Sequence, residues 1–176
     1  MGINREEITL KQLTDEDIPL FESWLDKEYI KRWFGDKEDW LNEINERNGK
    51  YSFLTHFIVF HNGREIGYCL YGDCFYIKDL EEEDHDFKSL YGDVTVKNHT
   101  YEIGYLIGEE GYLNKGIGKI IIQLLEAKLI EIGARQMVAD PCEKNIISVK
   151  ALLSNGFKKK NDGDYRKIIV SIKSTI

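Results

Sequence analysis

A short turn that runs directly into an apolar helix pattern has the residue types of an anion-binding site. The turn spans residues 112–119, and an apolar run follows it at residues 120–125. Gly116 and Gly118 would let the backbone approach a ligand without a Cβ in the way. The first N–H groups of a helix have no partner within the helix, and the positive end of its dipole lies there. The sequence therefore predicts a phosphate or diphosphate site at Lys115–Lys119.

A purely structural interpretation of this turn stays open. In that interpretation Gly116 and Gly118 only relieve crowding where the helix begins. The segment 101–107 reads as a strand that leads into the turn, so the expected unit is a strand, a loop and an anion-binding helix.

A second group of residues that could do chemistry is a segment rich in carboxylates. Residues 79–86 hold six carboxylates in eight positions, with Asp79 and Glu82 among them. The periodicity fails between Ile77 and Lys88, which predicts a loop inserted between strands. A charge run is usually a solvated connection. Its functional interpretation is an electrostatic attraction for a cation.

The cysteines and histidines predict neither a disulfide framework nor a metal site. Cys69, Cys74 and Cys142 form no CxxC pair and have no histidine at ligand spacing, so we expect reduced thiols. Cys142 could lie near an active cleft, although an inert structural cysteine is the favoured interpretation. His56 and His61 are expected to be structural because neither has a partner at a diagnostic spacing.

Composition limits the classes of protein and partner. With 176 residues, 42% hydrophobic and 31% charged, the chain is expected to form a single domain over residues 1–176. A net charge of -7 disfavours a nucleic-acid surface and tolerates a cationic small molecule. There is no signal-peptide core, and no apolar run approaches the roughly 20 residues that span a bilayer. We therefore expect a cytoplasmic monomer or homodimer with neither nucleic-acid nor membrane partners.

The elements that must position these residues begin with a strand and a helical arm. We expect the strand at residues 8–13 and three helices at residues 14–25, 24–35 and 37–48. Thr14 and Asp36 are the expected N-caps, and Gly35 ends the second helix. The aromatic residues of the arm are mostly expected in the core, whereas for Trp33 both a core position and a contact with a substrate stay open.

The rest of the chain predicts a mixed sheet. Asn62-Gly63 is the strongest short hairpin signal, and it separates two β-forming runs. The helix after the turn should end at Gly133. A strand is then expected at 135–140, a helix at 145–155, a strand from 157 and a last strand at 165–172. A crossover helix makes the strands at 101–107 and 135–140 parallel. The fold class is therefore α/β, with about six or seven strands flanked by helices.

Several motifs together resemble the GNAT superfamily of acyl-CoA-dependent N-acetyltransferases. They are Lys115-Gly116-Ile117-Gly118, Asn145, and Asn155-Gly156-Phe157. A second set is similar to the aminoglycoside 6'-N-acetyltransferase branch, which in turn resembles acyltransferases of siderophore assembly. That set is Trp24-Leu25 followed by Trp33-Phe34-Gly35, Ile66-Gly67-Tyr68, Asp140-Pro141 followed by Asn145, and Gly156-Phe157. Together the motifs cover nearly the whole chain.

The resemblance implies a single-domain GNAT-like fold in which a splayed strand pair forms the acetyl-CoA cleft. It assigns the diphosphate to the backbone N–H groups of Lys115, Gly116, Ile117, Gly118 and Lys119. It assigns the pantetheine arm to Tyr105, Leu106 and Ile107, and a cofactor contact to the Asn145 side chain. Backbone N–H groups near Leu106 to Gly108 are expected to polarise the thioester carbonyl.

The sequence departs from the family pattern at two catalytic positions. The aspartate of the aminoglycoside branch falls on Gly104, and the tyrosine that usually serves as general acid falls on Leu152. Glu102 lies two residues before Gly104, hence on the same strand face, and it matches a general-base glutamate of other members. The alternative is a strand glutamate that faces solvent or pairs with a lysine.

We therefore expect acetyl-CoA to donate an acetyl group to a primary amine of a small polycationic acceptor, which could be an aminoglycoside, by direct attack. The expected acceptor-binding residues are Trp33, Asp79, Glu82 and Asp140. Two other classes stay open: an acetyltransferase that acts on a protein N-terminus or lysine, and a non-catalytic acyl-CoA-binding module.

Overall fold

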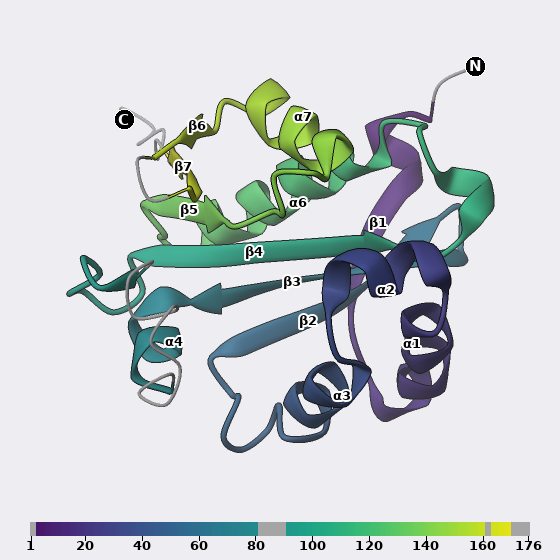
Figure 1. Cartoon of the computed structure of the whole chain (residues 1–176), viewed down its shortest axis with the longest axis horizontal. Helices are drawn as coiled ribbons and strands as arrows, with labels where there is room; N and C mark the ends of the chain where they lie inside the picture. The colour runs from purple at the N-terminus through teal and green to yellow at the C-terminus, as the bar shows by residue number, and fades with distance from the viewer. Residues whose placement is uncertain (1–2, 81–90, 161–162, 170–176) are drawn as a thin grey trace.

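A computed structural model describes residues 3–80, 91–160 and 163–169, and its centre is one sheet with helices on both faces (Figure 1). Within these residues, seven strands pair in the order β1-β2-β3-β4-β5-β7-β6. Their bounds are Ile8–Gln12 for β1, Leu54–His61 for β2, Arg64–Asp73 for β3, Thr100–Ile107 for β4, Gln136–Ala139 for β5, Lys158–Lys159 for β6 and Tyr165–Ile168 for β7.

The pairing confirms the expected mixed α/β sheet. β4 and β5 are parallel, and the other neighbouring strands are antiparallel. Asn62 and Gly63 have φ angles of 49° and 85°, the left-handed conformation that a two-residue hairpin turn between β2 and β3 requires. The last strand ends at Ile168, and most of its expected continuation to residue 172 lies outside the described residues.

Two helical layers cover the sheet (Figure 1). The helices are α1 Ile18–Leu25, α2 Glu28–Phe34, α3 Lys37–Asn45, α4 Cys74–Leu80, α6 Ile117–Glu131 and α7 Ile146–Ser154. α6 packs Ile121, Ile122 and Leu125 against one face of the sheet, and α1 to α3 cover the other face. None of the described helices is long and apolar enough to cross a membrane.

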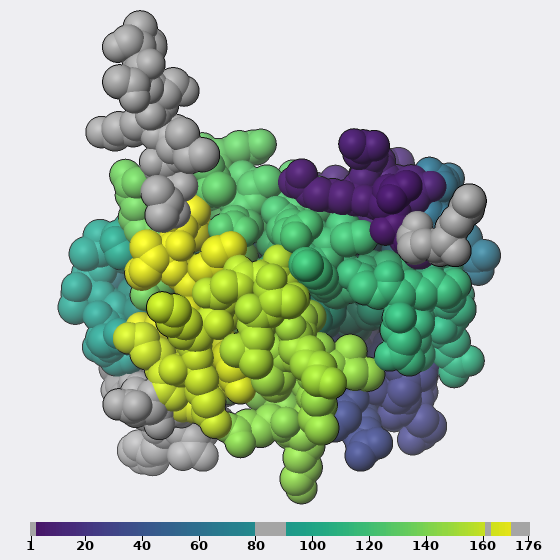
Figure 2. Space-filling model, turned by 90° about the horizontal axis from the view of Figure 1, so that it is seen from above, coloured from purple at the N-terminus to yellow at the C-terminus, as the bar shows by residue number. Residues whose placement is uncertain are grey.

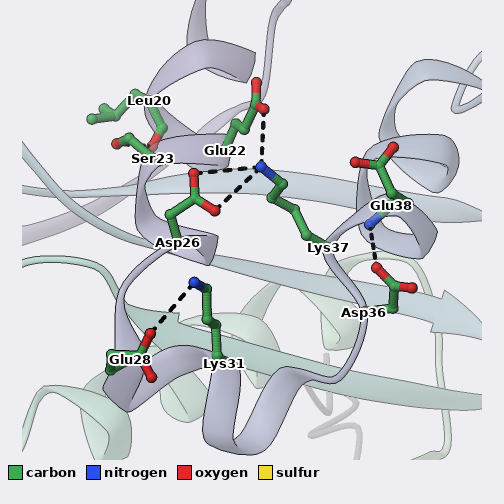
Figure 3. Close-up of polar contacts among 9 residues, drawn as sticks. All are labelled: Leu20, Glu22, Ser23, Asp26, Glu28, Lys31, Asp36, Lys37 and Glu38. Atoms are coloured by element: carbon green, nitrogen blue, oxygen red, sulfur yellow. Dashed lines mark hydrogen bonds and ion pairs between the residues drawn. The ribbon is translucent and has the colours of Figure 1, made fainter.

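Polar contacts fix the helical arm of α1, α2 and α3 (Figure 3). The Lys37 ammonium lies 3.3 Å from a Glu22 carboxylate oxygen and 3.2 Å from one of Asp26, so it joins the start of α3 to α1. Asp36 caps α3 by accepting a 3.0 Å hydrogen bond from the Glu38 N–H, as its sequence position predicts. This arrangement holds the inner face of α3 against the sheet.

The start of the acidic segment is helical, so the prediction of a loop from Ile77 is wrong for the residues up to Leu80. The buried carboxylate of Asp73 accepts hydrogen bonds from the N–H groups of Phe75 at 3.0 Å and Asn98 at 2.8 Å. The first bond caps α4, and the second ties it to the start of β4. Because the second partner is 25 residues away, local periodicity could not reveal this anchor. The remaining acidic residues, Glu82 included, lie outside the described part of the chain.

Candidate active site

The parallel strands β4 and β5 separate after three paired residues. Their register ends at Glu102 opposite Val138, while β4 continues to Ile107. The Gly108 N–H donates to the Ile66 carbonyl at 2.8 Å, and alternation along an antiparallel pair turns the N–H groups of Tyr105 and Ile107 away from β3. These two residues therefore present backbone donors along the open edge of β4.

This geometry reduces the number of backbone N–H groups that could donate a hydrogen bond to a thioester carbonyl. Because the Gly108 N–H is already bonded to Ile66, the prediction that it polarises a thioester carbonyl is wrong. The same alternation directs the Leu106 N–H toward β3. Of the three expected donors, Ile107 alone faces the open edge.

The predicted anion site lies at the end of this edge. Gly116 has a φ of +78°, and the first bond within α6 is donated by Ile120 to the Gly116 carbonyl. The N–H groups of Ile117, Gly118 and Lys119 therefore have no partner inside the helix. They border a cleft of about 600 Å³ that also contacts α2 and α7. Figure 2 shows the molecule hollowed between α7 and the connection from β4 to α6.

The two glycines of the turn have different roles. A Cβ at Gly116 would meet nothing within 4 Å, so glycine is needed there for its backbone conformation. A Cβ at Gly118 would lie 2.7 to 2.9 Å from the Tyr105 ring and hydroxyl. The space above Gly118 is therefore filled by a side chain of the protein, so the lack of a Cβ at this glycine relieves crowding against Tyr105.

The cleft offers groups that suit an anion joined to an extended, amide-containing arm. Unpaired N–H groups at the start of a helix suit a diphosphate. The open edge of β4 offers amide-binding groups at Tyr105 and Ile107, which suit an extended arm. Asn145 lines the cleft too, and its side-chain oxygen caps α7 by accepting from the Ser148 N–H at 3.3 Å. Its amide nitrogen is the part that remains for a ligand.

Glu102 is half-buried where the strands separate. Burial raises the pKa of its carboxyl to about 7; a hydrogen bond with the Tyr91 hydroxyl lowers it, and the charge of Asp140 raises it. A carboxyl with this pKa can accept a proton near neutral pH. Glu102 is therefore a partly desolvated carboxylate rather than a strand glutamate that simply faces solvent.

Glu102 lines a cavity of about 300 Å³ together with a second carboxylate, Glu43 of α3. Burial, followed by the charges of Glu102 and Asp39, raises the pKa of Glu43 to about 7. Aromatic rings and apolar groups form much of the remaining wall, from Trp40, Tyr51, Phe53, Leu54, Leu70 and Ile77. A cavity with carboxylates and aromatic faces suits an amine that carries an apolar body.

Sequence reasoning missed Glu43 and Tyr91. Glu43 follows Trp40 by three residues on α3 and precedes the buried Ile44, so helical spacing places it toward the inner side. That spacing was a usable signal for burial. Nothing in the sequence pairs Glu43 with Glu102, which is 59 positions along, since this contact depends on how α3 crosses the sheet.

A second cavity of about 200 Å³ shares lining residues both with the 300 Å³ cavity and with the 600 Å³ cleft, so it connects the two. Glu102 and Gly104 line it from β4, Asp140 and Cys142 from the segment after β5, and Trp33 from α2. Asp140 as a whole residue is exposed, but partial desolvation of its carboxyl, followed by the charge of Asp164, raises its pKa. Trp33 also lines the 600 Å³ cleft. The structure therefore brings Trp33, Asp140 and Glu102 together.

Other predicted residues lie elsewhere. Asp79 is exposed on α4 and lines none of these three cavities. The three cysteines are free thiols, as expected, with Cys69 and Cys74 buried and Cys142 exposed. In the described residues no cluster of His, Cys, Asp and Glu could hold a metal. His56 is buried, its Nδ1 lies 2.6 Å from the Tyr68 hydroxyl, and burial lowers its pKa to about 4.

Comparisons with known proteins agree with this geometry. The family profile described as an acetyltransferase (GNAT) domain matches residues 14–165. The aminoglycoside N(6')-acetyltransferase type 1 of Klebsiella pneumoniae is 22% identical over 164 residues, which cover 89% of this chain and 77% of that protein. The protein of the same name from Serratia marcescens gives the same values.

Solved structures show the same fold. AAC(6')-Ib in complex with paromomycin and acetyl-CoA superposes with a TM-score of 0.73 at 21% identity, covering 96% of this chain and 97% of that chain. The aminoglycoside N(6')-acetyltransferase of Legionella pneumophila gives a TM-score of 0.69 at 15% identity, with 96% and 94% covered. Likeness at these identities establishes the arrangement of the chain.

Proposed function

Because the chain belongs to the GNAT acetyltransferase family, we propose that it transfers the acetyl group of acetyl-CoA to a primary amine of a small cationic acceptor. The observation that carries the proposal is the position of Glu102. This carboxylate, with a pKa near neutrality, lies where β4 and β5 separate and lines both acceptor-side cavities.

The donor side of the reaction rests on backbone groups. The N–H groups of residues 117–119 would hold the diphosphate, and those of Tyr105 and Ile107 would align the pantetheine arm. When bound, acetyl-CoA supplies an activated acyl thioester. The Ile107 N–H, at the open edge, is the candidate donor to the carbonyl oxygen as negative charge develops there.

The acceptor side requires a base. A primary amine is protonated at neutral pH and must lose that proton before it attacks. In its ionised form Glu102 takes the proton, directly or through a water molecule. In their ionised forms Glu43, in the 300 Å³ cavity, and Asp140, in the 200 Å³ cavity, add negative charge near Glu102, which favours an acceptor with more than one cationic group. The similarity to proteins named as aminoglycoside acetyltransferases supports the same class of acceptor.

The proposal is tested by following thiol release from acetyl-CoA across a panel of aminoglycosides, polyamines and peptides. Glu102→Gln should lower kcat by roughly ten- to ten-thousand-fold with little change in cofactor affinity, because it removes the base. Glu131→Gln, at an exposed position of α6, is the matched control and should behave like the parent. A pH–rate profile shared by the parent and Glu102→Gln would reject the base assignment, and thiol release with none of the amines would reject the proposed reaction.

A further inference from the structure

In the proposed reaction CoA leaves as a thiolate, and this thiolate needs a proton. Helix α7 does not supply the tyrosine that usually donates it. Leu152, where the family places a tyrosine, is a hydrocarbon side chain that is 1% exposed. It packs in the core with α6 and cannot donate a proton. A donor must therefore come from another residue that reaches the place where the cofactor cleft meets the acceptor side.

Five residues line both the 600 Å³ cleft and the 200 Å³ cavity beside Glu102. They are Trp33, Phe34, Tyr105, Asn145 and Ser148. Two of them carry a hydroxyl group, Tyr105 of β4 and Ser148 of α7. An indole, a phenyl ring and a carboxamide are far weaker proton donors than a phenol.

Other phenols of the cleft are committed to different partners. The Tyr29 hydroxyl donates to the Gly108 carbonyl at 2.7 Å, and the Tyr112 hydroxyl lies 3.0 Å from Nδ1 of His61. Cys142 lines the 200 Å³ cavity but not the cofactor cleft. The selection thus leaves Tyr105 and its neighbour Ser148.

We propose that Tyr105 is the catalytic acid, which protonates the thiolate of the departing CoA, and that Ser148 positions its hydroxyl. The proposal rests on the proposed function. In balance, the ammonium group first loses one proton through Glu102 to solvent. A C–N bond then forms as the C–S bond breaks, the second proton on nitrogen passes to Glu102, and the Tyr105 hydroxyl proton passes to sulfur. Glu102 then releases its proton to solvent, and Tyr105 regains one from solvent.

The surroundings of Tyr105 hold the hydroxyl in a defined place and keep it protonated. Its ring lies against Gly118, at the first turn of α6, where a Cβ would come within 2.7 Å of the oxygen. Burial raises the pKa of Tyr105, and a hydrogen bond with Ser148 lowers it. Burial in the same cleft would also raise the pKa of a thiol, so a thiolate that forms there takes up a proton more readily than in water.

The decisive variant is Tyr105→Phe, which keeps the ring and removes the hydroxyl. It should lower kcat roughly a hundredfold or more while the affinity for acetyl-CoA stays close to that of the parent. In the binary complex with CoA, ultraviolet titration of the bound thiol should show a pKa about one to two units higher than in the parent complex, because the thiolate loses a hydrogen bond.

Matched variants separate catalysis from packing. Tyr71→Phe removes a phenol hydroxyl on β3 away from the three cavities, and it should leave kcat and the bound-thiol pKa unchanged. Ser148→Ala should reduce kcat and raise the bound-thiol pKa less than Tyr105→Phe does. Ser148→Thr, which keeps a hydroxyl, should restore both.

A bound-thiol pKa that is the same in Tyr105→Phe and the parent would overturn the proposal. A kcat for Tyr105→Phe within about twofold of the parent would overturn it as well. The titration uses CoA and needs no acceptor. If the parent acetylates no amine, the proposed function fails while the titration still decides the role of Tyr105.

Discussion

The pKa of Glu102 depends on burial and on residues from separate parts of the chain. Burial raises the pKa, a hydrogen bond with Tyr91 lowers it, the charge of Asp140 raises it, and Glu43 lines the same cavity. The charge of Glu102 raises the pKa of Glu43, and an electrostatic interaction between two titrating groups acts on both. Each of these carboxylates is therefore easier to ionise when the other is neutral.

At the residue scale, we predict that Glu43→Gln shifts the acidic limb of the pH–rate profile to lower pH. Glu102 accepts a proton only when it is ionised, so activity should rise as pH increases through its pKa of about 7. Removing the neighbouring charge lowers that pKa. The measurement is kcat/KM against pH for one cationic acceptor.

Glu38→Gln is the control for this shift. Glu38 is exposed on α3, is not among the groups that shift the pKa of Glu43 or Glu102, and does not line the cavity that holds Glu102. Its substitution should leave the acidic limb in place. An acidic limb that stays fixed in Glu43→Gln would show that the two carboxylates do not interact in the working enzyme.

At the scale of the elements, the connection from β4 to α6 depends on backbone conformation more than on open space. Gly116 adopts a φ of +78° and precedes α6 directly. Non-glycine residues of this chain reach the same region at asparagines, and Asn114 has a φ of 60° two positions earlier. Asparagine tolerates this conformation, whereas a β-branched residue does not.

We predict that Gly116→Val weakens acetyl-CoA binding about tenfold or more, while Gly116→Asn stays close to the parent. Valine would push the backbone out of the left-handed region and misdirect the N–H groups that follow. Titration calorimetry with acetyl-CoA measures the difference. Equal affinity of the valine variant and the parent would remove the anion site from this turn.

For the whole molecule, the charge distribution should govern the choice of acceptor. The chain carries a net charge of -7, and Glu43, Glu102 and Asp140 line the two acceptor-side cavities. Negative charge that surrounds a partly desolvated site attracts cations, and dissolved salt screens the attraction.

We predict that kcat/KM for a polyamine or an aminoglycoside falls between about 0.05 and 0.5 M salt, whereas kcat/KM for an arylamine that is uncharged at neutral pH changes little. Asp140→Asn should weaken the salt dependence for the polycation. A preference for the uncharged amine, insensitive both to salt and to Asp140→Asn, would contradict the polycation proposal.

Features set by neighbouring residues could be predicted from the sequence. The Asn62-Gly63 turn, the Asp36 cap of α3 and the stop at Gly133 each depend on the conformation or hydrogen bonding of a few consecutive residues. The order of strand, helix and strand also made the parallel pair predictable, because a crossover helix returns the chain in the same direction.

The three-dimensional arrangement alone decided which groups meet. The pairing of Glu43 with Glu102, the Tyr105 ring above Gly118, and the use of the Gly108 N–H by Ile66 each join residues that periodicity does not relate. The anchor of α4 on Asp73 likewise depends on a second partner at Asn98. Local sequence determines which conformations a segment prefers, but burial and charge at the site depend on the packing of segments that are distant in the chain.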